Sequence, residues 1–269
     1  QQVAADPRVT EDFITPKRNV FFARKTGSNF GWNWGIRLLT CGIYRPIRLL
    51  AYEEGRILDL SVVQDLSDLR AARLNITTNI ENYRSRNLVL RLKIAFNQKR
   101  IAETRIKVVS GKVTDQLKIR RPELWWPNGW GDQPLYTVSA ELSDGKKMLH
   151  QKNIRIGLRT VELVRESDQR GETFGFRING QRIFCKGANW IPADILPDRF
   201  TEQQCRHLLS SCVESNMNMI RVWGGGQYEP DFFYDFCDEN GLMIWQDFMF
   251  AVGPYLDSPA YLENVRQEG

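Results

Sequence analysis

Residues 221–248, RVWGGGQYEPDFFYDFCDENGLMIWQDF, gather side chains that could do chemistry. An arginine and a tryptophan are followed by three consecutive glycines and then by a run of carboxylates. The glycines do not form a phosphate-binding loop, because no Gly-Lys-Ser/Thr sequence follows them. We expect them to let the backbone turn tightly. Most of the carboxylates have a simpler explanation as helix N-terminal residues and a solvated helix face; they are Glu229, Asp231, Asp235, Asp238 and Glu239.

Three short apolar strands alternate with helices after about residue 175. The strands are predicted within RIFCKGANWIP, MNMIRVW and LMIWQDFMF. Thr201 and Gln204 have the spacing of a capping box, which predicts a helix start. A second helix should begin at Pro230 and end before Gly241. Strand–helix alternation with apolar strands is typical of parallel βα units. Three such units do not close a domain. Either the sheet is open and very small, or the sequence ends partway through a larger barrel, and we expect the second.

Polar and aromatic side chains end each of these strands. Arg221 ends the second strand, and Trp223, two residues later, should point the same way. Each has a structural alternative, an ion pair for the arginine and core packing for the tryptophan. Asn189 and Trp190 end the first strand and Asp194 lies in its loop, where the aspartate could bind a hydroxyl or cap a turn. Gln246 and Asp247 end the third strand.

The first half of the chain is strand-rich. Segments with many Val, Ile, Leu and Thr residues run from residue 55 to about 160 at the spacing of an antiparallel sandwich of the immunoglobulin-like type. Asp144-Gly145 and Asn179-Gly180 predict tight hairpins. The first fifty residues contain FGWNWGIRLLTCGIYRPIRLLAY, which is strand-like but too short for a core of its own. It is typical of the end of an upstream β-domain.

Bulk composition excludes several classes of protein. The chain has 42% hydrophobic and 26% charged residues, as in a soluble globular protein. It lacks an apolar run long enough to span a bilayer and shows no signal peptide. The net charge of +5 comes from basic residues interleaved with apolar ones, which is not a nucleic-acid-binding pattern. Five cysteines without CxxC spacing predict neither a metal site nor a disulfide framework, and no motif calls for a cofactor.

Three stretches together resemble glycoside hydrolase family two, in its β-mannosidase branch. FGWNWGIRLLTCGIYRPIRL is similar to the segment that closes the jelly-roll domain of that family. ELWWPNGWGDQPLYTVSAEL, with IGLRTVEL, resembles its sandwich domain. FRINGQRIFCKGANWIPAD and the stretch from NMNMIRVWGGG to WQDFMFA resemble the start of its catalytic (β/α)8 barrel. The resemblance divides the chain into residues 1–54, 55–164 and 165–269 for these three parts.

This resemblance implies an enzyme that removes terminal β-linked mannose with retention of configuration. Such enzymes use two glutamates about 5–5.5 Å apart, and in the family these end the fourth and seventh barrel strands. Both would lie beyond this chain, so the chain alone should be inactive. The matching arginine, Arg221, lies beside the nucleophile in the family, and the matching tryptophan, Trp223, lines the mannose pocket.

One position departs from the family pattern. The family has an aspartate where this chain has Asn33, and that aspartate reaches toward the mannose hydroxyls. Asparagine keeps one acceptor, gains a donor and loses the charge. This leaves open a family-two glycosidase of other sugar specificity. A non-catalytic carbohydrate-binding or scaffold module is the alternative from a different class.

Overall fold

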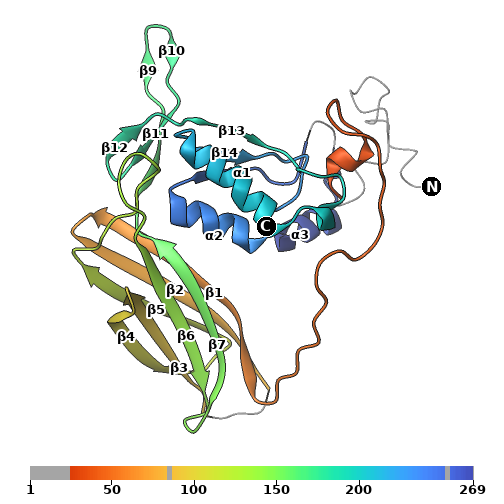
Figure 1. Ribbon diagram of the computed structural model, residues 1–269. Helices are drawn as coiled ribbons and strands as arrows, with labels where there is room; N and C mark the ends of the chain where they lie inside the picture. Colours follow the sequence, from red (N-terminus) through yellow and green to blue (C-terminus); the bar gives the residue numbers. More distant parts are fainter. Residues whose placement is uncertain (1–24, 84–86, 252–254, 269) are drawn as a thin grey trace. The chain divides into compact units, whose positions relative to one another are not determined.

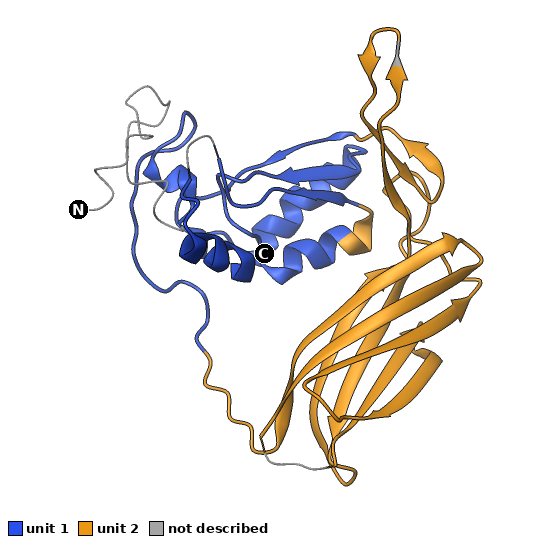
Figure 2. Ribbon diagram, turned by 180° about the vertical axis from the view of Figure 1, so that it is seen from behind, with its two compact units in different colours: residues 1–47, 186–237, 242–269 blue, residues 48–185, 238–241 orange. Residues whose placement is uncertain are grey.

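The computed structural model describes residues 25–83, 87–251 and 255–268. The chain divides into two compact units (Figure 2). Unit 1 contains residues 1–47, 186–237 and 242–269, and unit 2 contains residues 48–185 and 238–241. The three-part division predicted from the sequence, with boundaries after residues 54 and 164, stays a prediction. Its first 24 residues lie outside the described part.

The larger part of unit 2 is a sandwich of two antiparallel sheets (Figure 1). The first, in the order β1-β2-β5, contains β1 (Gly55–Asp68), β2 (Ala71–Asn82) and β5 (Lys112–Arg120). The second, in the order β4-β3-β6-β7, contains β3 (Val89–Phe96), β4 (Lys99–Lys107), β6 (Leu135–Ser143) and β7 (Met148–Gly157). A β-sandwich was predicted for this region, and that coarse prediction is confirmed.

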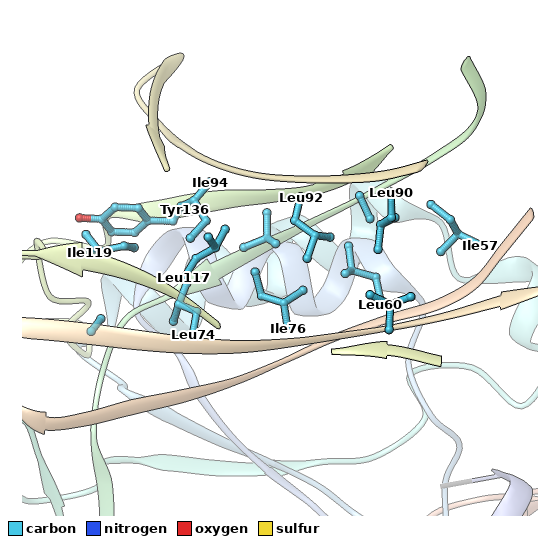
Figure 3. Close-up of a cluster of buried hydrophobic side chains, with 14 of the residues drawn as sticks. Ile57, Leu60, Leu74, Ile76, Leu90, Leu92, Ile94, Leu117, Ile119 and Tyr136 are labelled. Atoms are coloured by element: carbon cyan, nitrogen blue, oxygen red, sulfur yellow. The ribbon is translucent and has the colours of Figure 1, made fainter. Parts of the chain in front are cut away.

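The sandwich core lies between the two sheets. Along β2 every second residue is buried, as expected for a strand with one face against a core. Figure 3 shows side chains of both sheets meeting in this core. Leu74 and Ile76 contribute from one sheet, and Leu90, Leu92 and Ile94 from the other. This single apolar layer is what holds the two sheets together.

Leu92 is fully buried in this core, so its truncation should destabilise unit 2. We expect Leu92→Ala to lower the free energy of unfolding by about 2–5 kcal/mol, since it removes buried methyl groups and leaves a cavity. Val63→Ala is the control, because Val63 is 67% exposed on β1. Urea titration of both variants measures the difference. Equal stability of the two variants would contradict this placement of the core.

Two details of the sandwich differ from the sequence prediction. Strand β5 is not among the segments whose Val, Ile, Leu and Thr content predicted strands, because its polar and charged residues outnumber its buried ones, Val113, Leu117 and Ile119. Asp144-Gly145 does not form a two-residue hairpin, since Ser143 pairs with Met148 across a four-residue loop. The Asp144 carboxylate accepts hydrogen bonds from the amides of Lys146 and Lys147, and these stabilise the longer turn.

A smaller sheet follows the sandwich, with the order β12-β11-β8. Its strands are β8 (Val161–Val164), β11 (Gly175–Ile178) and β12 (Gln181–Ile183), and a short hairpin of β9 (Ser167–Asp168) and β10 (Gly171–Glu172) lies between β8 and β11. The predicted Asn179-Gly180 hairpin is confirmed, with φ values of 50° and 79°. Both residues therefore adopt the left-handed conformation that a two-residue hairpin loop requires.

Unit 1 contains a parallel sheet of β13 (Gly187–Trp190), β14 (Met219–Val222) and β15 (Met243–Gln246). The helices α1 (Glu202–Glu214), α2 (Asp231–Asn240) and α3 (Pro259–Glu268) follow the three strands in turn. A short 3-10 helix, η4 (Pro197–Arg199), precedes α1. The predicted capping box of Thr201 and Gln204 is present, which confirms the start of α1. The parallel strand–helix alternation is confirmed as well.

Helices α1 and α2 cover one face of this sheet (Figure 1). Their buried side chains form a second apolar core with those of β14. Cys205 and Leu209 come from α1, Ile220 and Val222 from β14, and Phe233 from α2. The opposite face of the three strands is therefore the one that is left for the polar residues at their ends.

Residues 25–54 contain a 3-10 helix, η3 (Gly27–Phe30), and one isolated bridge between Trp32 and Gly35. The strands expected from the sequence here do not form within these described residues. A strand needs a neighbour for its amides and carbonyls. Several apolar side chains are exposed in this segment; they are Ile36, Leu38, Leu39, Ile43, Ile47, Leu49 and Leu50.

Candidate functional site

The candidate site lies where the three parallel strands end. Asn189 of β13 and Trp245 of β15 are both in register with Arg221 of β14, so these side chains point to one face of the sheet. Val222, the next residue of β14, points the other way and is buried against the helices. Asp247 lies two residues after Trp245, on the same side as Arg221. The face away from the helices therefore carries the polar cluster.

Arg221 is held by three hydrogen bonds from its guanidinium. Its Nε donates to Asp247 Oδ1 at 3.2 Å and its Nη2 to Asp247 Oδ2 at 2.7 Å. Its Nη1 donates to Asn189 Oδ1 at 3.2 Å. A two-pronged arginine–carboxylate pair is geometrically specific as well as strong. The arginine and both of its predicted neighbours thus lie in one hydrogen-bonded cluster.

Asp247 has a further role in the turn that follows β14. Its Oδ2 also accepts a hydrogen bond from the amide of Gly224 at 3.1 Å. The side chain is 17% exposed, against 41% for Arg221. The carboxylate therefore joins the arginine to the first glycine of the turn, a link that strand-end spacing alone could not predict.

The glycines are needed because of close packing, not because of an unusual backbone angle. None of these three glycines has a positive φ. A Cβ on Gly224 would lie 2.3 Å from the carbonyl oxygen of Phe250, and one on Gly225 would lie 2.0 Å from the ring of Trp223. Gly225 therefore leaves room for the Trp223 ring.

Trp223 lies in an aromatic group with Trp32 and Trp34. The Trp32 ring meets it edge-on with centroids 4.8 Å apart, and the Trp34 ring does so at 6.0 Å. The segment that carries them is tied to the glycine turn, since Ser28 N donates to Gly225 O at 2.9 Å. The three tryptophans thus form a partly exposed aromatic surface, which begins two residues after Arg221 in the chain.

Asn33 is exposed between Trp32 and Trp34. The two tryptophans flank it in a short turn that closes through paired backbone hydrogen bonds between Trp32 and Gly35 at 3.2 Å. This position is at the edge of the aromatic surface.

Asp194 has the local contacts of a turn residue. Its Oδ1 accepts a hydrogen bond from Leu196 N at 2.9 Å, and Arg199 lies 3.4 Å from its other oxygen. Of the two possibilities kept open for it from the sequence, these contacts favour the turn cap. Its role at the site stays a prediction.

Trp190 points to the helix-covered side of the sheet. It is in register with Val222, and its ring packs edge-on against Phe233 with centroids 5.0 Å apart. Its Nε1 donates to Glu229 Oε1 at 3.0 Å. The tryptophan thus joins the second core, while its neighbour Asn189 joins the polar cluster.

Glu229 is the residue that sequence reasoning missed. We interpreted the carboxylates from Glu229 to Glu239 as helix N-terminal residues and a solvated helix face, and for Glu229 the solvated face is wrong, because it is only 7% exposed. Burial raises the pKa of its carboxyl group, although the hydrogen bond from Trp190 and the charge of Arg45 act in the opposite direction. The sequence did contain one sign that Glu229 differs from the other carboxylates. It lies between the glycines and Pro230, just before the helix rather than in it.

A cavity of about 330 Å³ lies beside the glycine turn. Arg45 Nη2 donates to Tyr228 O at 3.0 Å at its wall. Its lining residues include Lys25, Thr26, Gly27, Tyr44, Arg45, Gly224, Gly226, Gln227, Tyr228 and Met249. The described residues contain no cluster of three or more histidine, cysteine, aspartate or glutamate side chains suited to a metal ion. None of the described helices is long and apolar enough to cross a membrane.

Known proteins are similar to this chain in sequence and in fold. Residues 55–159 match the model of the glycosyl hydrolases family 2. The chain is 40% identical over 247 residues to β-mannosidase B of Neosartorya fischeri and 42% identical over 249 residues to that of Aspergillus terreus. Each match covers 91% of this chain and 29% of the relative. The chain thus spans less than a third of the length of these curated relatives.

Solved structures agree with these matches. The crystal structure of a β-D-mannosidase from Dictyoglomus thermophilum is similar over 99% of this chain and 33% of its own, with a TM-score of 0.92 and 39% identity. A β-glucuronidase from Parabacteroides merdae is similar over 80% of this chain and 27% of its own, with a TM-score of 0.68 at 19% identity, which shows a shared fold alone. The chain is therefore similar to β-mannosidases over nearly its whole length, and residues 55–159 carry the match to glycosyl hydrolase family 2.

Proposed function

We propose that this chain is part of a longer, retaining exo-β-mannosidase and contributes one wall of its sugar site. The observation that carries this proposal is the hydrogen-bonded cluster of Arg221, Asp247 and Asn189 at the ends of three parallel strands, with Trp223 two residues after Arg221 in the chain. In barrel enzymes the site is built at these carboxyl-terminal strand ends. The similarity to β-mannosidases supports the choice of sugar.

The three parallel strands are the first three of a (β/α)8 barrel in this proposal. Strands β13 and β15 are the two edges of the sheet and β14 lies between them. An open edge exposes unpaired amides and carbonyls, which a closed barrel pairs with further strands. The exposure of Trp245, at 40%, on the face away from the helices is consistent with a barrel interior that further strands would fill.

The other two parts follow the family resemblance. Residues 1–54 would be the end of a jelly-roll domain, and the exposed apolar side chains between Ile36 and Leu50 are consistent with strands that pair and pack elsewhere in that domain. Residues 55–164 would be the immunoglobulin-like sandwich, and residues 165–269 the start of the catalytic barrel.

Each site residue has a definite task in this proposal. Arg221 supplies a fixed positive charge beside the nucleophilic glutamate and keeps that carboxylate ionised. Asp247 and Asn189 hold the guanidinium in place. Trp223 offers its ring face to the apolar side of the mannose ring. The two catalytic glutamates of a retaining enzyme, one acid/base and one nucleophile, are supplied by the rest of the protein.

The remaining predicted residues are assigned by their contacts. Asn33, exposed at the edge of the aromatic surface, would meet the sugar hydroxyls. Trp190 supports the site from the helix side, because its ring packs on Phe233. Asp194 fixes the loop after β13 through its turn contacts.

A second candidate is a family-two glycosidase with another sugar specificity, and Asn33 is the observation that favours it. The neutral amide at this position has one acceptor and one donor where an aspartate would have acceptors alone. A non-catalytic carbohydrate-binding module would keep the same wall and lack turnover. Activity measurements separate all three.

The test compares the complete protein with this chain alone. We expect the complete protein to hydrolyse an aryl β-mannoside, and the purified 269-residue chain to show no turnover, because it would lack both catalytic glutamates. Release of the chromogenic aryl alcohol measures both. Clear turnover by the pure chain would contradict the proposal, and so would a folded complete protein that cleaves no aryl glycoside.

A further inference from the structure

Glu229 places a carboxyl group inside unit 1 at the end of the glycine turn. Its Oε1 accepts the hydrogen bond of the Trp190 indole at 3.0 Å. Its Oε2 is buried and has no hydrogen-bond partner among the described residues. An interior carboxyl group with one of its oxygens left unpaired calls for an explanation, since buried polar atoms are nearly always paired.

The surroundings of this carboxyl group favour its neutral form. An ionised carboxylate is costly to bury without a paired cation. Arg45 is the charged side chain that acts on it, but the arginine is exposed and its Nη2 donates to Tyr228 O. Burial also raises the pKa of the nearby Cys205 thiol, to about 12, so the surroundings disfavour charge here.

The bond to Trp190 connects Glu229 with the backbone of the candidate site. Trp190 O accepts a hydrogen bond from Trp223 N at 3.0 Å, and Trp223 O accepts one from Gly226 N at 3.0 Å. The indole itself is packed between Phe233 and Phe200, with centroids 5.0 and 6.4 Å away. The glycine turn is therefore joined to the end of β13 by the backbone on one side and by Glu229 on the other.

We propose that Glu229 is a positioning residue that holds the Trp190 indole, and through it the backbone of Trp223, with a neutral carboxyl group. It acts from the helix side of the sheet and does not touch the sugar. Its role in turnover rests on the proposed glycosidase function. Its role in fixing the indole does not depend on that function.

The proposal predicts different effects for two substitutions of Glu229. Glu229→Gln keeps an oxygen acceptor of the same size, so we expect kcat/KM of the complete protein to stay within about twofold of wild type. Glu229→Met keeps the bulk but leaves the buried indole N–H without an acceptor. We expect it to lower kcat for an aryl β-mannoside about tenfold, or about 1.4 kcal/mol, with little change in KM.

A spectroscopic signal tests whether Glu229 holds the Trp190 indole, and this measurement does not require turnover. Fluorine NMR of the complete protein carrying 5-fluorotryptophan reports each indole, and Trp190→Phe identifies the Trp190 signal by its loss. We expect Glu229→Gln to leave that signal in place and Glu229→Met to shift or broaden it. Glu202→Met on the exposed surface of α1 is the matched control and should change neither signal nor rate.

Each outcome decides the matter. If Glu229→Gln loses as much activity as Glu229→Met while the Trp190 signal stays unchanged, an ionised carboxylate is needed and the proposal is wrong. A Glu229→Met protein with wild-type rate and signal would also overturn it. If Glu229→Met does not fold, Trp190→Phe takes its place and should show the same fall in kcat. If the wild type cleaves no aryl glycoside, the proposed function fails and the fluorine signals alone decide the role of Glu229.

Discussion

Replacing Asp247 with alanine in the complete protein should lower kcat/KM for an aryl β-mannoside by between about a hundredfold and a thousandfold. The carboxylate accepts two hydrogen bonds from Arg221 and one from the Gly224 amide. Without it, the guanidinium loses its fixed position and the glycine turn loses its tie to β15. A displacement of about 1 Å in a catalytic site can cost about a hundredfold in rate, and the loss of a positioned charge adds to this.

A matched control exists on the sandwich. Asp68 also binds an arginine through two hydrogen bonds, from Arg70 Nε at 3.0 Å and Nη2 at 3.3 Å, but this pair is exposed. Asp68→Ala should leave kcat/KM unchanged, because exposed ion pairs contribute little. Steady-state kinetics and thermal unfolding of both variants separate a lost site from a lost fold. Near-wild-type kinetics of Asp247→Ala would contradict this prediction and would show that the Arg221–Asp247 pair has a purely structural role.

Replacing Trp223 with alanine should lower kcat/KM by about a hundredfold, or by nearly 3 kcal/mol of transition-state stabilisation. The ring meets the edges of Trp32 and Trp34, and Gly225 provides the space beside it. Its removal takes away the proposed sugar platform and leaves the aromatic surface incomplete. Trp223→Phe keeps an aromatic face, and we expect it to retain most of this stabilisation.

Trp130→Ala is the control for this substitution. Trp130 is 45% exposed in unit 2, so its truncation should change neither kcat/KM nor the unfolding midpoint appreciably. Kinetics on an aryl β-mannoside compare the three variants. Wild-type efficiency in Trp223→Ala would assign this tryptophan to packing alone.

The strand ends were the part of the site that the sequence could predict. Strand boundaries were enough to place Arg221, Asn189 and Asp247 at strand ends. That Arg221 and Asn189 share a face follows from the register between β13 and β14, which the structure gives. The pairing of Arg221 with Asp247 could not be predicted, because it depends on the register between β14 and β15 and on the loop beyond β15.

Tertiary packing explains the places where the structure differs from the prediction made from the sequence. The run of carboxylates near α2 predicted a solvated face, yet Glu229 is buried because it precedes the helix and meets Trp190. Residues 36–50 are apolar enough for strands, but no strand forms within this described stretch. Local composition reports the tendency to form a strand, while a sheet requires a partner.

The central claim is that this chain builds one wall of a β-mannoside site. The most direct test is to measure kcat/KM of the complete protein on aryl β-mannoside, β-glucoside, β-galactoside and β-glucosaminide. We expect the mannoside to be preferred at least about tenfold over each of the others, since a site that hydrogen-bonds sugar hydroxyls discriminates by their positions. A higher kcat/KM on any of the other three sugars would contradict it.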